Sequence, residues 1–272
     1  MFEQCPLKYQ LTYEYGFTKL FSRYKNWFKS KNQVLSTIPG DEFNPIEDLN
    51  DDVLESSSKV RGLSDVKGRI IHKALQNEVS INNIESFIDE ALKNELAIIP
   101  FEKNNYEKLK KEILGDLLLY LESDTYSRIS SLKNFHNEYE VYVKEKDYFL
   151  YGIIDKLIIE DKTVKIIDYK TTDISEGEIK ERVVTYLPQL QFYSYIVSQL
   201  FDIIEVFELV IVFIKHPEKK YTATLNKREI AQFSNKLQKM IKNVREGKFN
   251  KNLNHCSNCL YALQQTNCII SD

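Results

Sequence analysis

The chain has 272 residues, of which 43% are hydrophobic and 28% are charged, so it has the composition of an ordinary globular protein with a substantial core. Its eight glycines and six prolines exclude a fibrous or loop-dominated chain. The net charge of −3 lacks the basic excess of a typical nucleic-acid binder, although a basic groove on a nearly neutral protein is still compatible with such a partner.

Targeting and membrane segments are not expected in this chain. The first eleven residues have no apolar stretch suited to a signal peptide. No run approaches the ~18–20 apolar residues that a membrane span needs. We therefore expect an intracellular, cytoplasmic protein, in which four cysteines suit metal ligation better than structural disulfides.

The first half of the chain, residues 1–136, is predicted to be mainly helical. Residues 29–65 are polar and rich in Pro, Asn, Asp and Ser, which is typical of a loop or an insertion. Apolar residues at helical spacing then predict three successive helices. The first carries Gly68, Ile71, His72 and Leu75, and the others span about 83–98 and 103–122.

The second half, residues 137–250, is predicted to form an α/β core. Tyr139, Val141 and Val143 alternate with polar residues, as in a half-buried strand. In chain order we then expect strands at 148–159 and 164–169, a helix at 185–201, strands at 205–214 and 221–225, and a helix at 227–247. Residues 251–272 form a polar segment that contains three cysteines. No repeat or linker divides the chain, so we expect one domain over residues 1–272.

Two carboxylates and a lysine on adjacent predicted strands are the main chemical signal. Asp155 lies within a strongly apolar run that includes Gly152, and Asp168 and Lys170 lie at the end of the next strand. The period of two puts Asp168 and Lys170 on one face of that strand, with Tyr169 opposite. If the strands are neighbours, these groups make an oxygen-rich site suited to Mg²⁺ or Mn²⁺, with a lysine to orient or deprotonate water. Each residue alone is more often a solvated residue at a strand end.

The segments GIIDKLII and KIIDYKTT resemble two motifs of the RecB-like branch of the PD-(D/E)XK nucleases. That branch includes the exonucleases of CRISPR spacer acquisition and the AddAB-type recombination nucleases. The segments KGRIIHKAL and YLPQLQFYSYI resemble its helical histidine motif and the helix that follows its core. The resemblance implies an α/β fold of the restriction-endonuclease type, with a mixed central sheet flanked by helices and a helical N-terminal portion.

The same resemblance implies roles for four further residues. His72 is implied as a metal ligand, and Gln189 and Tyr193 as residues that assist catalysis and contact DNA. Glu140 matches a less regular acidic position near the metal. Against these roles, a histidine in an amphipathic helix is usually a surface or core residue, a Gln and a Tyr on one helix face are usually packing residues, and Glu140 can be a solvent-facing strand residue.

The four cysteines have an uneven distribution along the chain. Cys256, Cys259 and Cys268 lie near the C-terminus, and Cys5 lies in the segment CPLKYQL near the N-terminus. Iron-containing members of the RecB-like family are similar in having one cysteine before the nuclease core and three after it, so the resemblance implies a [4Fe-4S] cluster. The spacing before Cys268 is longer than is common in the family. Zinc bound by the same thiolates, with His255 as a substitute ligand, and four unrelated thiols remain alternatives.

These patterns predict a divalent-metal-dependent DNA nuclease, with an exonuclease acting on single strands or DNA ends as the form that the resemblance implies. A noncatalytic DNA-binding scaffold of a repair or CRISPR assembly is the first alternative. The second is the nuclease subunit of a helicase–nuclease complex. Since the chain has no phosphate-binding G-x-x-x-x-G-K-[ST] loop, a helicase or a CRISPR-adaptation protein would be a separate partner.

Overall fold

The computed structural model describes residues 5–15, 63–96, 103–145, 148–172, 174–253, 261–264 and 267–268. The chain divides into two compact units, Asn50–Phe233 and the pair of segments Met1–Leu49 and Ser234–Asp272. The single domain over residues 1–272 stays a prediction. Most of the loop predicted at 29–65 lies outside the described residues, but its last three residues belong to a helix.

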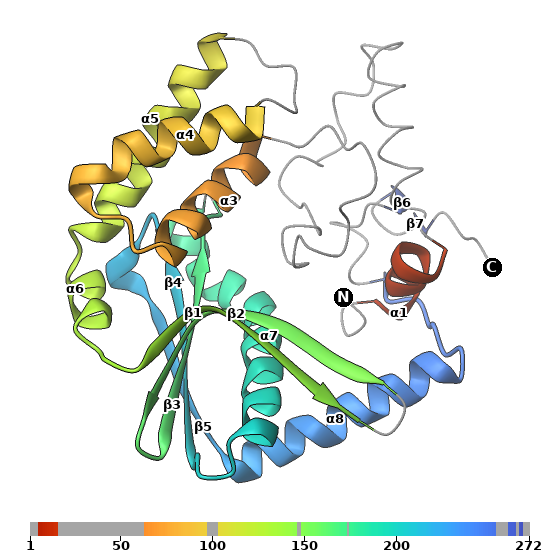
Figure 1. The fold of residues 1–272 in the computed structure, drawn as a ribbon. Coiled ribbons are helices and arrows are strands. Elements are labelled where there is room, and N and C mark those ends of the chain that lie inside the picture. Colours follow the sequence, from red (N-terminus) through yellow and green to blue (C-terminus); the bar gives the residue numbers. More distant parts are fainter. Residues whose placement is uncertain are drawn as a thin grey trace. The chain divides into compact units, whose positions relative to one another are not determined.

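The larger unit contains a mixed sheet of five strands. The strands are β1 (Phe135–Lys144), β2 (Phe149–Glu160), β3 (Thr163–Lys170), β4 (Val206–Phe213) and β5 (Tyr221–Asn226), and they lie in that order across the sheet. Only β3 and β4 are parallel, and the other neighbours are antiparallel. Helices flank this sheet (Figure 1). The α/β fold with a mixed central sheet, expected from the sequence, is therefore confirmed.

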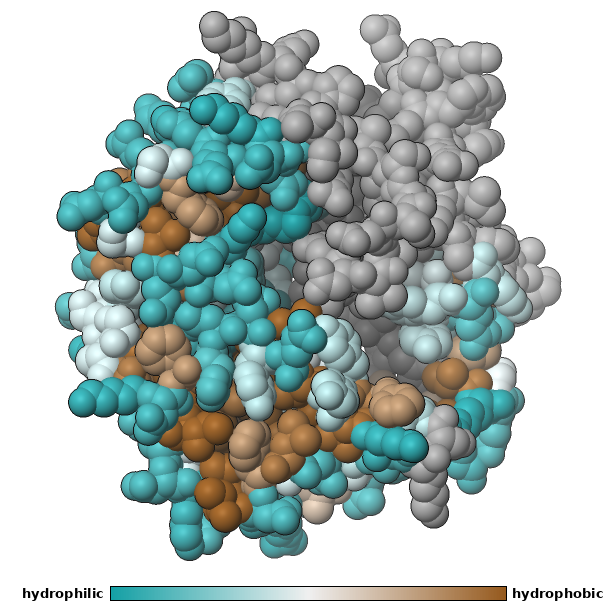
Figure 2. Space-filling view, in the orientation of Figure 1, coloured by the Kyte–Doolittle hydropathy of each residue, from teal (hydrophilic) through white to brown (hydrophobic). Residues whose placement is uncertain are grey.

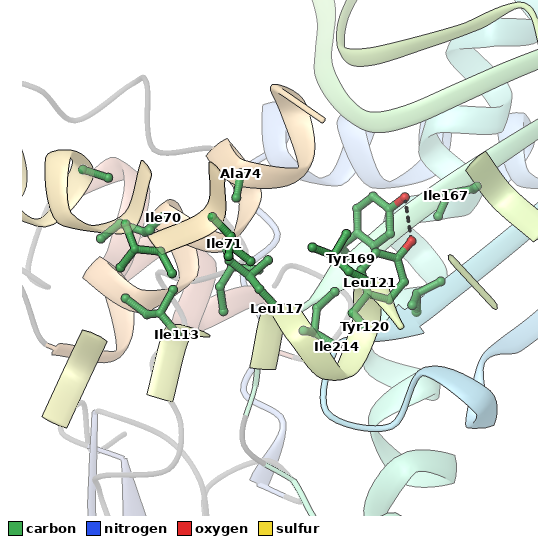
Figure 3. Packing of buried hydrophobic residues seen from close by; sticks show 14 of the residues in the cluster. Ile70, Ile71, Ala74, Ile113, Leu117, Tyr120, Leu121, Ile167, Tyr169 and Ile214 are labelled. Atoms are coloured by element: carbon green, nitrogen blue, oxygen red, sulfur yellow. Dashed lines mark hydrogen bonds between the residues drawn. The ribbon is translucent and has the colours of Figure 1, made fainter. Parts of the chain in front are cut away.

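In the described part of the larger unit, four helices precede the sheet, and they build the main core against one of its faces. They are α3 (Leu63–Gln76), α4 (Ile84–Leu96), α5 (Lys103–Leu121) and α6 (Asp124–Ser130), with the 3₁₀ turn η3 (Ile81–Asn83) before α4. Their apolar residues recur at helical spacing, so each helix turns one stripe inward. The outer surface over α4 and α5 is mostly hydrophilic (Figure 2). The buried cluster joins α3 and α5 to β3 through Ile71, Leu117 and Ile167 (Figure 3).

The helix α7 (Ile179–Leu200) connects the two parallel strands, as a parallel pair requires. It contacts β1 to β4. It begins six residues earlier than the predicted helix, because Ser175 and Glu178 form a capping box around the 3₁₀ turn η4 (Glu176–Glu178). Pro188 lies inside the helix without ending it. The short helix α6 was not predicted, and Ser123 caps it by accepting a hydrogen bond from Tyr126 N at 3.0 Å.

The second unit brings together segments from both ends of the chain. It contains α1 (Pro6–Tyr9), the π-helical turn η1 (Gln10–Glu14) and the two-stranded sheet of β6 (Ala262–Gln264) and β7 (Asn267–Cys268). The ring of Tyr9 stacks on Phe249 with centroids 6.4 Å apart, and Thr12 Oγ1 lies 3.1 Å from the hydroxyl of Tyr261. Residues that are far apart in the sequence are thus neighbours here.

Two further elements complete the description. The 3₁₀ turn η5 (Pro217–Lys219) lies between β4 and β5, and the long helix α8 (Lys227–Arg245) follows β5. Among the described helices, none combines the length and the apolar character that a membrane crossing needs.

Candidate active site

The two aspartates meet where β2 and β3 separate. The pairing of these strands runs from Glu160 opposite Thr163 to Lys156 opposite Ile167, and the next two residues in this register are Asp155 and Asp168. Instead of a further strand pair, the backbone N–H of Tyr169 donates a hydrogen bond to Asp155 Oδ2 at 2.7 Å. The fork between the strands therefore places both carboxylates at one point of the sheet.

The alternation along the end of β3 separates the charged residues from the core. Lys170 Nζ lies 3.1 Å from Asp168 Oδ2, and both side chains are largely buried. Between them, Tyr169 belongs to the hydrophobic core and its hydroxyl accepts a hydrogen bond from Tyr120 at 3.2 Å (Figure 3). The core contact on one face thus holds the ion pair on the other.

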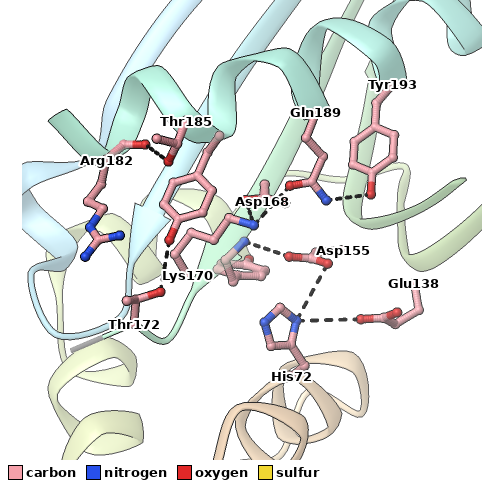
Figure 4. A network of polar contacts seen from close by, with 12 residues as sticks. His72, Glu138, Asp155, Asp168, Lys170, Thr172, Arg182, Thr185, Gln189 and Tyr193 are labelled. Carbon is pink, nitrogen blue, oxygen red and sulfur yellow. Dashed lines mark hydrogen bonds and ion pairs between the residues drawn. The ribbon is translucent and has the colours of Figure 1, made fainter. Parts of the chain in front are cut away.

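The helix α7 orients the lysine. Gln189 Oε1 accepts a hydrogen bond from Lys170 Nζ at 3.0 Å, and Gln189 Nε2 donates one to the hydroxyl of Tyr193 at 2.9 Å. The ammonium group also lies 4.4 Å from the centre of the Tyr186 ring. Tyr186, Gln189 and Tyr193 follow one another at spacings of three and four, so one face of α7 supplies all these contacts (Figure 4).

A missing side chain on β2 makes room for this arrangement. A Cβ atom on Gly152 would lie 2.7 Å from Cε1 of Tyr193, which is too close for two carbon atoms. A second glycine, Gly68 on α3, approaches Thr171 just after β3, since its Cβ would lie 3.2 Å from Thr171 Oγ1. This close approach brings His72, one turn further along α3, to the fork.

His72 and two acids form a group that can hold a metal ion. His72 Nδ1 lies 3.6 Å from Asp155 Oδ1 and 4.0 Å from Glu138 Oε1 (Figure 4). The ligand atoms of the three residues all lie within 4.8 Å of one another. Asp168 is not in this close group, but its carboxylate interacts electrostatically with Asp155 and His72.

Glu138, rather than the expected Glu140, is the acid of β1 beside His72. The two residues lie two positions apart on the strand, and the register with β2 decides between them. Glu138 stands between the pairs Asn137–Lys156 and Tyr139–Ile154 and so faces Asp155, whereas Glu140 is exposed and pairs with Ile153. The backbone of Glu138 has a φ of 48°, a conformation that non-glycine residues seldom adopt.

The electrostatics of the fork favour the binding of a cation. Burial raises the pKa of Asp155 to about 6, although the charge of Lys170 and the hydrogen bond from Tyr169 N act in the opposite direction. Burial also raises the pKa of Asp168 to about 6; Lys170 again lowers it, and the charge of Asp155 raises it further. Apart from its ion pair with Lys170, Asp168 Oδ2 has no hydrogen-bond partner among the described residues. Since carboxylate oxygens and imidazole nitrogen are suitable ligands, these residues fit a divalent ion.

Of the cysteines, only Cys5 has a described side chain. It is buried and forms no disulfide. The side chains of Cys256, Cys259 and Cys268, and also that of His255, lie outside the described residues.

Comparison with known proteins identifies the family of the chain. The sequence model of the PD-(D/E)XK nuclease superfamily matches residues 49–263. The chain therefore belongs to the PD-(D/E)XK nuclease superfamily, whose members are generally metal-dependent nucleases. No curated protein matches the chain.

Two solved structures illustrate how distant the structural relatives are. The protein SSO0001 is 18% identical, with 74% of this chain and 97% of that chain covered and a TM-score of 0.36. A protein from Eubacterium rectale described as a candidate exonuclease is 12% identical, with 72% of each chain covered and a TM-score of 0.45. Such likenesses are too weak to bear on function.

Three residues of the site were not found from the sequence. Glu138 has the same spacing pattern as Glu140, and only the strand register separates them. Tyr186 lies three residues before Gln189, so the helical period that linked Gln189 to Tyr193 was also a signal for Tyr186. Gly152 stands at the start of the GIID segment, but its contact with Tyr193 depends on how α7 packs.

The substitution Gly152→Ala should push the ring of Tyr193 away from β2. We expect a loss of about 1–3 kcal/mol in the free energy of unfolding, because the ring is buried and has little room to move. If the chain cleaves DNA, activity should fall by about tenfold or more as the contact from Tyr193 through Gln189 to Lys170 is lost. Urea unfolding and cleavage rates measure the two effects. The matched control is Gly115→Ala on α5, where a Cβ meets nothing within 4 Å; an equal loss of stability in both variants would contradict the steric explanation.

Binding of Mn²⁺ should weaken as the pH falls through about 6. Asp155 and Asp168 must both lose their protons to bind a cation, and their pKa values lie near that pH. Below pH 6 we expect the affinity to fall by about tenfold per pH unit for each carboxylate that must be deprotonated, with little change from these groups above pH 7. Calorimetric titration between pH 5 and 8 measures this slope. In Asp168→Asn the slope should fall by about one proton, and an unchanged affinity between pH 5 and 6 in the wild type would rule the explanation out.

Proposed function

We propose that the chain is a divalent-metal-dependent DNA nuclease of the RecB-like branch, which hydrolyses phosphodiester bonds in single strands or at DNA ends. The observation that carries the proposal is the fork of β2 and β3. There a buried carboxylate pairs with a lysine, and a second carboxylate lies beside a histidine and Glu138. A structural salt bridge needs only one acid and one base, whereas this arrangement leaves acidic oxygens and an imidazole around one point.

The residues of the fork divide the chemical work between them. His72, Asp155 and Asp168 would hold one or two Mg²⁺ or Mn²⁺ ions, and Glu138 adds a further carboxylate. When bound, such a cation supplies Lewis acidity toward a phosphoryl oxygen and lowers the pKa of water. The two aspartates serve as ligands only when deprotonated, which their pKa values allow at neutral pH.

Lys170 would act on the phosphate and on the attacking water. Its ammonium group is held by Asp168 and Gln189, so its position is set before any substrate arrives. A fixed positive charge at this point offsets the negative charge that develops on phosphorus without a cost of reorganisation. Tyr193 acts through Gln189, whose amide it fixes by a hydrogen bond, and is therefore a positioning residue in this proposal.

With Mg²⁺ or Mn²⁺, the protein should degrade linear single-stranded DNA, and the variants Asp168→Asn and Lys170→Ala should be slower by roughly 10²–10⁴-fold. Gel analysis of end-labelled DNA measures the rate. Circular single-stranded DNA should resist cleavage if the enzyme requires an end. Extensive cleavage of circular single-stranded DNA would show that the enzyme is an endonuclease and not the proposed exonuclease.

Matched control variants lie in the turn between the same two strands. Asp161→Asn and Lys162→Ala change one carboxylate and one exposed lysine, which pairs only with Glu205 among the described residues. Both should keep the wild-type rate. If the wild type and the variants Asp168→Asn and Lys170→Ala are equally inert with either metal, the proposal of a nuclease is wrong, and a noncatalytic DNA-binding scaffold takes its place.

We further infer that Cys5, Cys256, Cys259 and Cys268 bind a [4Fe-4S] cluster. Cys5 is buried and lies next to α1, and the segment after it contacts Phe249, which precedes the C-terminal cysteines in the sequence, and Tyr261, which lies between Cys259 and Cys268. These contacts between the two ends of the chain support a cluster that takes thiolate ligands from both. Such a cluster would tie both ends of the chain into the second unit.

Protein purified without oxygen should be coloured and contain about four iron and four sulfide per chain. Cys5→Ser should lower the iron content and the melting temperature, because one ligand and the link between the chain ends are lost. Ser257→Ala, which lies between two of the cysteines and removes no thiolate, is the control. Elemental analysis that finds one zinc and no iron would assign the site to zinc, and a protein free of both metals would leave only unrelated thiols.

A further inference from the structure

The face of α7 that contacts Lys170 continues beyond the residues that touch it. Tyr186, Gln189 and Tyr193 are spaced by three and four, and Arg182 precedes Tyr186 by four, so it lies on the same face, one turn nearer the start of the helix. Figure 4 shows its side chain on the side of α7 where Thr172 and Lys170 lie. Gln189 lies seven positions after Arg182, a separation of about 10 Å along the helix axis.

The guanidinium group of Arg182 is not used by the described part of the fold. The side chain is half-buried, but the described residues offer it no hydrogen bond and no ion pair. The nearest acid one turn earlier is Glu178, whose Oε2 already accepts hydrogen bonds from Ser175 N at 2.7 Å and from Ser175 Oγ at 2.5 Å. Glu178 therefore acts on Arg182 only through its charge.

The other described acids at the start of α7 form no ion pair with Arg182. Glu176 pairs with Lys219 at 2.8 Å, and Glu181 is exposed to solvent. Figure 4 shows Thr172 on the same side of α7 as Arg182, and the Thr172 hydroxyl lies 3.1 Å from the hydroxyl of Tyr186. Since no described residue pairs with it, the half-buried guanidinium of Arg182 can bind an anion. Its planar fork of N–H donors matches the oxygens of a phosphate.

We propose that Arg182 forms a second phosphate subsite, which binds the DNA backbone at a distance from the bond that is cleaved. This subsite rests on the proposed nuclease function and specifies how the substrate runs along α7. At the ~3.4 Å rise per nucleotide of a stacked strand, the 10 Å between Arg182 and Gln189 spans about three nucleotides. Because Gln189 holds Lys170, the phosphate at Arg182 should lie about three nucleotides from the phosphate at Lys170.

Single-stranded oligonucleotides that carry one neutral methylphosphonate at successive positions test this subsite. Dissociation constants are measured with Ca²⁺ in place of Mg²⁺, so that binding is read without cleavage. The wild type should bind about tenfold more weakly when the neutral linkage lies at the position held by Arg182. Arg182→Ala should bind unmodified DNA about tenfold more weakly and lose the sensitivity at that position. Its affinity should also fall less steeply with salt, by about one unit of slope.

Three further variants separate a phosphate contact from a structural role. Lys180→Ala removes an exposed cation from the same helix but off this face, and should keep the wild-type profile. Arg182→Gln keeps a polar hydrogen-bonding side chain without the charge and should behave like Arg182→Ala, whereas Arg182→Lys should restore part of the sensitivity. All should have the melting temperature of the wild type.

The outcomes distinguish this inference from the nuclease proposal. If Arg182→Ala and Arg182→Gln retain the wild-type methylphosphonate profile, or if Lys180→Ala loses it equally, the subsite is refuted even when the wild type cleaves DNA. If the wild type binds DNA with the predicted profile but never cleaves it, the phosphate subsite is supported and the proposal of nuclease activity is refuted.

Discussion

The candidate site depends on the burial of two carboxylates at the point where two antiparallel strands separate. Charged groups lose hydration when buried, and two acids near each other also repel, so the protein must supply compensation. Lys170 and the backbone N–H of Tyr169 supply part of it. The pKa values of Asp155 and Asp168 are nevertheless raised to about 6, so the compensation is incomplete. A divalent cation would complete it, which ties the energetics of this fold to its chemistry.

The core on one face of the sheet controls the chemistry on the other. Tyr169 stands between Asp168 and Lys170, and its ring packs edge-on against Tyr120 of α5. Because side chains alternate along a strand, fixing the tyrosine in the core also fixes its two charged neighbours toward α7. The helices α3 and α5 therefore position the fork through their packing in the core with Tyr169, and α3 also contributes His72.

The helix α7 lines the site on the side of Lys170, which its residues Tyr186 and Gln189 contact. It joins β3 to β4, so its direction is set by the parallel pair, and its close packing on β2 is possible because residue 152 is a glycine. One face of this helix then carries Gln189 and Tyr193 and, about two turns nearer its start, Arg182. Residues at spacings of three and four follow one side of a helix, which is the arrangement that the proposed phosphate subsite uses.

The sequence by itself determined the α/β fold, most of the helices and strands, and the placement of Asp168 and Lys170 on one face, because these follow from local periodicity. Only the tertiary structure decided between Glu138 and Glu140, since two residues at a spacing of two look alike until the register with β2 is known. It likewise decided that Gly152 faces Tyr193 and that His72 reaches Asp155. These contacts join elements far apart in the chain, and their geometry depends on packing that no local pattern encodes.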